Sequence, residues 1–307
     1  MLDIALVGTS GMMPLPNRNL SSMAVRLNGS ILIVDCGEGT QVSLRTLGWG
    51  YKNIDIICFT HFHADHISGL PGLLLAMAAS RTKPVTIIGP VGLIHIVQCL
   101  CIIAPQLPFD IDFVELPADG LIETQIGEYY ISALPVNHGC PCFAYTIAAK
   151  RAGKFDADAA AKLGLPVQMW SKLQKGMDVE FGDKIYTPDM VMGNERKGIK
   201  VAYCTDSRPT KQLPVFIRNA DLFICEGLHG DPTWAQKVRK SKHMMYAEAA
   251  QLALDGNVKK MWLTHYSPSV INPKEHLKQA RDIFPNTYAG YDRLTEIILF
   301  DETKGDD

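Results

Sequence analysis

The chain has 307 residues, of which 47% are hydrophobic and 20% charged, and its formal net charge is −2 at pH 7. This length and apolar content are sufficient for one large α/β domain or two small ones. The near-neutral charge excludes a wholly basic nucleic-acid coat, although not a local basic patch. No apolar run reaches the ~18 residues of a membrane span, and the N-terminus lacks the basic region of a signal peptide. The eight scattered cysteines indicate reduced core thiols in a cytoplasmic protein.

The first part of the chain predicts strands joined by one long loop. Residues 4–8 are strand-like. The long loop that follows to residue 22 contains several prolines and glycines, which favours a functional loop; the alternative is an ordinary hairpin connection. Residues 23–27 and 31–34 predict a hairpin around Asn-Gly. Asp35, directly after the hairpin, either orients a group of a nearby site or caps a helix.

The most informative stretch is residues 60–66, Thr-His-Phe-His-Ala-Asp-His, which places three imidazoles and a carboxylate within six positions. It follows an apolar, β-branched run at 54–59 and precedes a turn into an apolar helix at 67–77. Neighbouring side chains on such a turn point to opposite sides, so the first two histidines can hold one ion, and the aspartate with the third histidine a second. Nitrogen and carboxylate ligands suit zinc, with manganese or iron as alternatives.

Four ligands cannot saturate two ions, so we expect further ligands at other strand ends. His138 follows the strand-like run 129–136, Asp206 follows the run 199–204, and His265 ends another strand. A carboxylate between two cations can bridge them and offset their repulsion, which makes the aspartate the candidate bridge.

The remaining histidines carry less information. A strand at 85–89 and a helix at 92–103 are predicted, and His95 lies among apolar residues of that helix, so we interpret it as structural. His229 and His276 lie outside the pattern of strand ends and are expected at the surface. The sequence Cys140-Pro141-Cys142, just after His138, is either redox-active or, as we favour, a packing feature.

Residues 149–198 differ in composition from the rest of the chain. Between 150 and 175 six lysines or arginines stand against two acids, a net charge of +4. A short helix is predicted at 157–163. We interpret this insert as a projecting basic arm without enough large apolar residues for a core of its own; the alternative is a solvated loop without a partner.

The order of strands and helices predicts the fold. Ligands that follow several strands converge if the strand ends share one edge, and helices alternate with these strands along the chain. We therefore expect a four-layer α/β sandwich, two sheets between helices, in a single domain spanning residues 1–307 that carries the inserted arm.

These residues resemble the metallo-β-lactamase superfamily through the HxHxDH run, and the ribonuclease Z family of tRNA 3′-end processing endonucleases through more specific motifs. The resemblance covers nearly the whole chain, arm included. The specific motifs are Gly8-Thr9-Ser10, Pro14 to Asn19 ending in Arg18-Asn19, Asp35 to Gln41 (DCGEGTQ), Tyr203 to Ser207, and His243 before an Ala-rich helix.

The resemblance implies a set of site residues. Two zinc ions per subunit would be held by His61, His63 and His138, by Asp65, His66 and His265, and by Asp206 as the bridge. Asp65 would also act as the base that activates water, while His243, oriented by Glu226, would assist the leaving oxygen. The alternative for this last histidine is a position beside a helix without a chemical role.

The resemblance also implies removal of 3′ trailers from precursor tRNA by a cytoplasmic homodimer. The basic arm at 150–175 and the loop with Arg18 would bind the RNA. One alternative is a metallo-hydrolase of another small phosphodiester, or of a thioester or lactam, on the same fold. The other is a non-catalytic protein that binds RNA or senses metal.

Overall fold

The computed structural model describes residues 1–194 and 196–301. They form two compact units: residues 1–149 with 199–299, and residues 150–194 and 196–198 with 300–301. No helix in the described ranges is long and apolar enough to cross a membrane.

The first unit contains two seven-stranded mixed sheets. The first sheet has the order β16-β1-β2-β3-β4-β5-β6, and β3 to β6 run parallel. Its strands are β1 (Leu2–Gly8), β2 (Ser22–Leu27), β3 (Ser30–Val34), β4 (Ile54–Cys58), β5 (Val85–Pro90), β6 (Ile111–Leu116) and β16 (Thr295–Ile298).

The second sheet has the order β15-β14-β13-β12-β9-β8-β7, and β12 to β15 run parallel. Its strands are β7 (Ile122–Ile126), β8 (Tyr129–Pro135), β9 (Phe143–Arg151), β12 (Arg196–Cys204), β13 (Leu222–Glu226), β14 (Met261–Thr264) and β15 (Thr287–Ala289).

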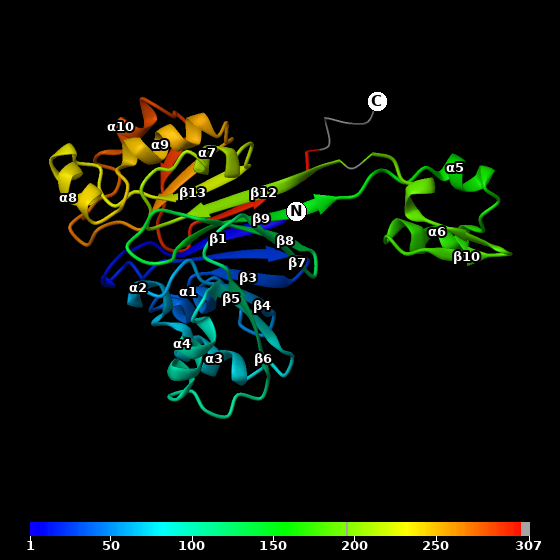
Figure 1. Cartoon of the computed structure of the whole chain (residues 1–307), viewed down its shortest axis with the longest axis horizontal. Helices are drawn as coiled ribbons and strands as arrows, with labels where there is room; N and C mark the ends of the chain where they lie inside the picture. Colours follow the sequence, from blue (N-terminus) through cyan, green and yellow to red (C-terminus); the bar gives the residue numbers. More distant parts are fainter. Residues whose placement is uncertain (195, 302–307) are drawn as a thin grey trace. The chain divides into compact units, whose positions relative to one another are not determined.

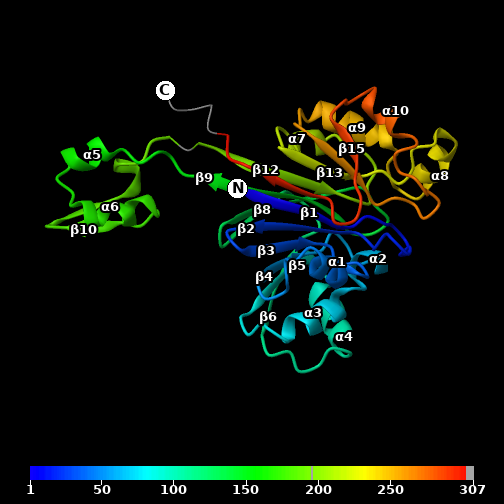
Figure 2. The ribbon, with the colours of Figure 1, turned by 180° about the vertical axis from the view of Figure 1, so that it is seen from behind.

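Helices cover the outer face of each sheet (Figures 1 and 2). One apolar cluster joins α1, α3 and α4 to the first sheet, and another joins α7, α9 and α10 to the second. The predicted four-layer sandwich is confirmed. The helices of this unit are α1 (Thr40–Thr46), α2 (Ala64–Ile67), α3 (Leu70–Ala78), α4 (Leu93–Cys101), α7 (Leu213–Phe216), α8 (Ala235–Lys240), α9 (Tyr246–Asp255) and α10 (Leu277–Arg281).

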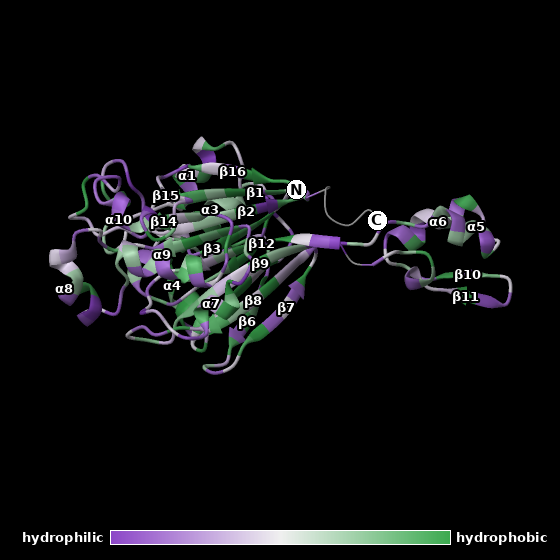
Figure 3. Ribbon diagram, turned by 90° about the horizontal axis from the view of Figure 1, so that it is seen from above, coloured by the Kyte–Doolittle hydropathy of each residue, from purple (hydrophilic) through white to green (hydrophobic). Residues whose placement is uncertain are grey.

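The central strands are apolar along their length because both of their faces are covered. In β13 all five residues are buried, and in β4 all but Asp55 are. Parallel strands in such a sheet appear in the sequence as continuous apolar runs rather than as alternating ones. Figure 3 shows the hydrophobic colour along much of the strands of this unit.

Several local predictions require correction. Strands β7 and β9 were not predicted. The three central residues of β7 are all polar, and β9 contains three alanines, a residue that favours helices. His95 lies on the predicted helix, α4, but it is exposed rather than packed among the apolar residues of that helix. His229, expected at the surface, is 6% exposed, because its ring stacks on Trp234.

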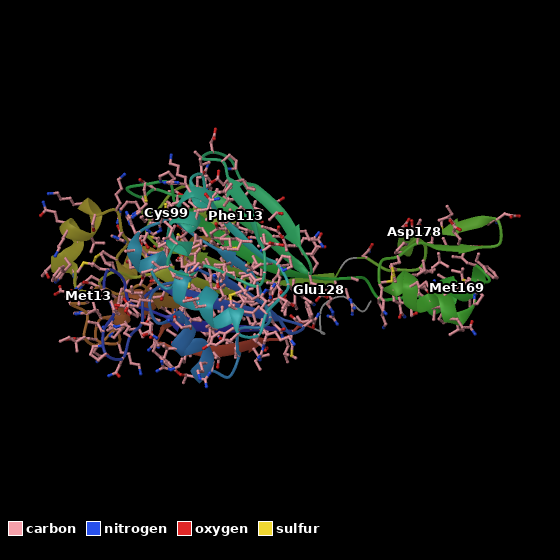
Figure 4. All side chains as sticks on the ribbon, turned by 90° about the horizontal axis from the view of Figure 1, so that it is seen from below. Met13, Cys99, Phe113, Glu128, Met169 and Asp178 are labelled. Atoms are coloured by element: carbon pink, nitrogen blue, oxygen red, sulfur yellow. The ribbon has the colours of Figure 1, made fainter. Side chains whose placement is uncertain are left out.

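The second unit has a small apolar core of its own, so the expectation that it lacks the residues for one is wrong. Trp170 packs against this core and donates from Nε1 to the carbonyl of Leu165. Figure 4 labels Met169 and Asp178 in this unit. Its elements are α5 (Ala157–Lys162), α6 (Val167–Gln174), β10 (Val179–Phe181) and β11 (Lys184–Tyr186), and its core residues are Ala160, Leu165, Leu173, Val179 and Val191.

Candidate metal centre

The seven candidate ligands follow four strands of the two sheets. The HxHxDH run begins three residues after β4 and continues into α2, while His138 lies three residues beyond β8. Asp206 lies two residues beyond β12, and His265 directly follows β14. The sandwich brings these side chains together.

Three imidazoles form a first group of ligand atoms. Nε2 of His61 lies 3.0 Å from Nδ1 of His63, and Nε2 of His138 lies 3.3 Å from that same Nδ1. Cys140, which follows closely in the chain, places its Sγ 3.8 Å from Nε2 of His63.

A second group joins two imidazoles to a carboxylate. The Nε2 atoms of His66 and His265 are 3.2 Å apart. Oδ2 of Asp65 lies 3.7 Å from the first and 3.5 Å from the second of these nitrogens.

Asp206 lies between the two groups and turns one oxygen to each. Its Oδ1 is 3.9 Å from Nε2 of His61 and 3.8 Å from Nε2 of His138. Its Oδ2, which is buried, is 3.1 Å from Nε2 of both His66 and His265. This is the arrangement required of a bridging carboxylate.

The donor set fits metal ions. Two nitrogens bound to one tetrahedral zinc at about 2.05 Å lie about 3.3 Å apart, and the pairs of imidazole nitrogens are separated by 3.0 to 3.3 Å. Lone pairs facing each other at this distance are unfavourable unless a cation or a proton lies between them.

Partners outside the two groups hold the ligands in place. Oδ2 of Asp35 lies 2.8 Å from Nδ1 of His66, and its Oδ1 accepts from the backbone of Thr60 at 2.8 Å. Asp35 therefore orients a histidine ring, as predicted, and the alternative of a helix cap fails because α1 is capped by Gly39.

Charges within the centre favour the metal-binding protonation states of His61 and Asp206, whereas Asp206 and Asp35 more than offset burial and raise the pKa of His66 well above its usual value. Burial and the neighbouring His66 lower the pKa of His61 to about 2, which leaves this ring neutral. Burial raises the pKa of Asp206, but the surrounding histidines, led by His265, more than offset it and hold the pKa well below its usual range. A neutral imidazole and an ionised carboxylate are the forms that bind metal.

A histidine–glutamate pair flanks the centre. Nδ1 of His243 lies 2.9 Å from Oε2 of the fully buried Glu226, whose Oε1 accepts from the backbone N–H of Ser207. Burial alone would lower the pKa of His243, but Glu226 more than offsets it and raises the pKa to about 9. The ring is thus a cation at neutral pH, and its Nε2 remains for a substrate.

Comparisons with known proteins agree with this geometry. Residues 2–100 match the family model described as Anti-Pycsar protein Apyc1. Ribonuclease Z of Lachnoclostridium phytofermentans is 50% identical over 307 residues, covering 99% of this chain and all of that protein. Ribonuclease Z of Clostridium kluyveri is 52% identical, covering 98% of this chain and all of that protein. The chain belongs to the ribonuclease Z family.

The fold agrees with solved structures as well. Human tRNase Z, short form, superposes with a TM-score of 0.71 over 97% of this chain and 100% of that chain, at 21% identity. This likeness supports the fold alone, and it confirms the metallo-β-lactamase-like sandwich predicted for this ribonuclease Z family member.

Two residues at the centre of this ribonuclease Z family member were missed by the sequence analysis. Arg208 pairs with Glu248 and donates to the backbone carbonyl of His243, which fixes the position of that histidine. Its place two residues after Asp206 was the available signal. The backbone N–H of Met12 donates to Oδ2 of Asp65 at 2.6 Å, a contact for which the sequence offers no signal.

Left-handed backbone is concentrated at the centre. Asp35, Asp206 and His265 have φ angles of 60°, 55° and 54°, and Met12 has 67°. Such conformations cost L-residues roughly 1–3 kcal/mol and persist where the surrounding structure enforces them, which is typical of functional sites.

Gly11 gives a test of the centre's packing. A Cβ at this position would lie 2.6 Å from Cε1 of His265, so Gly11→Ala must displace that ring. We expect metal affinity to fall by about 10- to 100-fold, the range for disturbing a ligand's support. Gly139→Ala is the matched control, because no atom lies within 4 Å of its added Cβ. Metal titration of both variants checks this, and equal affinities would contradict it.

Proposed function

We propose that this ribonuclease Z family member is a zinc-dependent endoribonuclease that removes 3′ trailers from precursor tRNA. The observation that carries the proposal is the position of Asp206, with one oxygen toward each of two three-ligand groups. Full-length relatives at 50% and 52% identity that are named ribonuclease Z support the substrate class.

Two zinc ions per subunit are part of the proposal, with manganese or iron as alternatives. When bound, a pair of such ions lowers the pKa of a water molecule and stabilises negative charge on phosphoryl oxygens. The proposed ligands are His61, His63 and His138 for one ion, Asp65, His66 and His265 for the other, and Asp206 for both.

The chain's own residues would move two protons during hydrolysis. Water oxygen bonds to phosphorus, and Asp65 accepts the proton that this water loses. The bond between phosphorus and the leaving oxygen breaks, and Nε2 of His243 donates its proton to that oxygen. Glu226 supports this proton donor because its carboxylate stabilises the charged ring at 2.9 Å.

The basic arm is the proposed RNA-binding element outside the centre. Its lysines at 154, 162, 172 and 175 are exposed. Arg18, in contrast, donates from Nη2 to the carbonyl of Val270 at 2.6 Å, so in this geometry it holds its own loop in place. The arm therefore carries most of the proposed contact with tRNA phosphates.

Reversing charge on the arm should separate RNA binding from chemistry. For the triple variant Lys162→Glu, Lys172→Glu, Lys175→Glu we expect KM for precursor tRNA to rise at least about tenfold, with a weaker salt dependence, because each lost phosphate contact reduces the salt slope by about 1. Turnover of bis(p-nitrophenyl) phosphate should not change. Lys52→Glu with Lys83→Glu, exposed lysines of the first unit, is the control. Equal salt slopes for all three proteins would contradict the arm's role.

The activity itself is tested with a 3′-extended precursor tRNA and purified protein. The expected result is one new 3′ end and an intact trailer fragment. A ladder of products shortened from the 3′ end would indicate an exonuclease and overturn the proposal.

A homodimer in the cytoplasm completes the proposal. Several large apolar side chains on and around α3 and α4 are exposed, which supports an interface with a second subunit. All eight cysteines are free, which supports a reducing compartment such as the cytoplasm. Sedimentation of the purified protein tests the dimer. These apolar residues are Leu75, Val91, Ile94, Ile102 and Ile103.

The alternative is a metallo-hydrolase of another small phosphodiester. The match of residues 2–100 to a family of a different name favours it, because these residues contain the HxHxDH run. Under this alternative the charge-reversed arm would have no effect on the true substrate.

A further inference from the structure

A cavity of about 450 Å³ opens beside the candidate metal centre, within the first unit. It shares His243 and His265 with the centre, so a substrate bound at the metal ions would extend into it. Cavities of this size accommodate small organic groups. The lining residues used below are Met12, Trp234, Lys237, His243 and His265.

Met12 forms one wall, and its backbone is fixed. Its N–H donates to Oδ2 of Asp65, its φ is 67°, and its side chain is 74% exposed. The left-handed backbone is unfavourable for methionine, because its Cβ crowds the following carbonyl oxygen. A large apolar side chain is therefore kept in solvent, in an unfavourable backbone conformation, at the rim of the cavity. Neighbouring Met13, labelled in Figure 4, does not line the cavity.

Trp234 forms a second wall. Its ring stacks on the buried ring of His229, with centroids 4.6 Å apart and planes at 10°. Nζ of Lys237 lies 4.4 Å from the indole centroid. The His229 ring and the Lys237 ammonium group are both too close to the indole centroid to lie on the same face of the indole, so Lys237 covers the face opposite His229. Because Lys237 is exposed, its side chain can move away from the indole, so that a planar ligand stacks on this face and the ammonium group pairs with a phosphate.

The surrounding charge fits a nucleotide. The last turn of α8 carries Lys237, Arg239 and Lys240, and Nζ of Lys242 lies 2.8 Å from the carbonyl of His138. An aromatic ring, a flexible thioether and adjacent cations are the combination that binds a base together with its phosphates.

We propose that this cavity binds the base of the nucleotide whose oxygen leaves during cleavage, an inference that rests on the proposed function. The position of His243 determines which of the two nucleotides that flank the scissile phosphate lies at the cavity. It lines the cavity and is the proposed proton donor to the leaving oxygen, so the nucleoside that carries this oxygen is the one next to the cavity. Met12 and Trp234 hold the base between them.

The test couples protein variants to the substrate. Precursor RNAs carry an abasic site either at the nucleotide with the leaving oxygen or at the one across the cut, and each is given to wild type, Met12→Gly and Trp234→Ala. Glycine accepts the left-handed backbone, so Met12→Gly removes the side chain without strain. We expect each variant, and the first abasic site in wild type, to lower kcat/KM by about tenfold, the worth of one base stack.

The decisive result is the combination. The abasic site at the nucleotide with the leaving oxygen should lower kcat/KM much less in each variant than in wild type. The abasic site across the cut should lower kcat/KM by the same factor in all proteins. Met13→Ala, the control, should behave as wild type. Independent effects of variant and abasic site would overturn the proposal, and coupling to the second abasic site would overturn the assigned side.

A binding measurement distinguishes failure of this inference from failure of the proposed function. Adenosine 3′-monophosphate and adenosine 5′-monophosphate, one for each ribose oxygen that can leave, are titrated into the metal-loaded protein by calorimetry, without any cleavage. We expect Met12→Gly and Trp234→Ala each to weaken binding about tenfold relative to wild type and Met13→Ala. Unchanged affinity in both variants would overturn the cavity assignment even if tRNA were processed, and weakened affinity without tRNA cleavage would retain it.

Discussion

Asp206→Asn should lower turnover of bis(p-nitrophenyl) phosphate by about a thousandfold or more, equivalent to about 4 kcal/mol of transition-state stabilisation. The side chain is almost completely buried and lies within 3.1 to 3.9 Å of four imidazole nitrogens of the candidate ligands. Asparagine keeps the shape but removes the charge that holds two cations together. The metal content per subunit, measured by mass spectrometry of the purified protein, should fall with the activity.

Asp221→Asn is the matched control for this variant. Asp221 is a buried carboxylate at the amino end of β13, where it pairs with Lys259, and so belongs to the same sheet but not to the centre. It should retain metal and activity. Full metal content together with full activity in Asp206→Asn would refute the bridging role.

His243→Ala should slow hydrolysis by about 100- to 10,000-fold, the usual contribution of a general acid, with metal content unchanged. Nδ1 of this ring is engaged by Glu226, and the backbone is fixed by Arg208, so the loss of the ring removes a positioned proton donor rather than a ligand. Metal loss in this variant would place His243 among the ligands instead. Unchanged turnover with full metal would leave it without a chemical role.

The pH profile of Glu226→Gln provides a separate readout. A proton donor is active below its pKa and inactive above it, so the rate should fall as pH rises through the pKa of His243. The Glu226 carboxylate is the main group that raises this pKa toward about 9. Its removal should move the alkaline limb of the profile to lower pH, whereas a purely structural glutamate would lower the rate at every pH alike.

The sequence predicted the centre because its signal is local and chemical. Three histidines and an aspartate within six positions have few other uses. Apolar runs before His138, Asp206 and His265 identified strand ends that the mixed second sheet brings to one edge. The four-layer arrangement followed from the same runs. Asp35 was placed correctly for the same reason, since it directly follows a strand.

Features that leave no signature in the type or spacing of residues were not predictable. The hydrogen bond from Met12 to Asp65 uses the backbone amide, which every residue except proline provides, so the type of residue at position 12 does not indicate it. His229 is buried by stacking on Trp234, a consequence of a local turn rather than of its neighbours' polarity. The core of the second unit joins a few leucines and valines with Trp170 and Ala160, which are spread over a polar segment whose composition alone does not mark them as buried.

The division of ligands between the sheets has a consequence for biogenesis. The strands of the first half of the chain supply His61, His63, Asp65 and His66, while the other three ligands come from strands of the second sheet, the last of them 199 residues beyond His66. On a nascent chain emerging from the ribosome, the four proposed ligands of the first ion are complete once Asp206 has been made, whereas those of the second ion are complete only with His265, after β14. Cation capture would therefore occur in two steps, and the second step would come late in synthesis, once strands of both sheets are present.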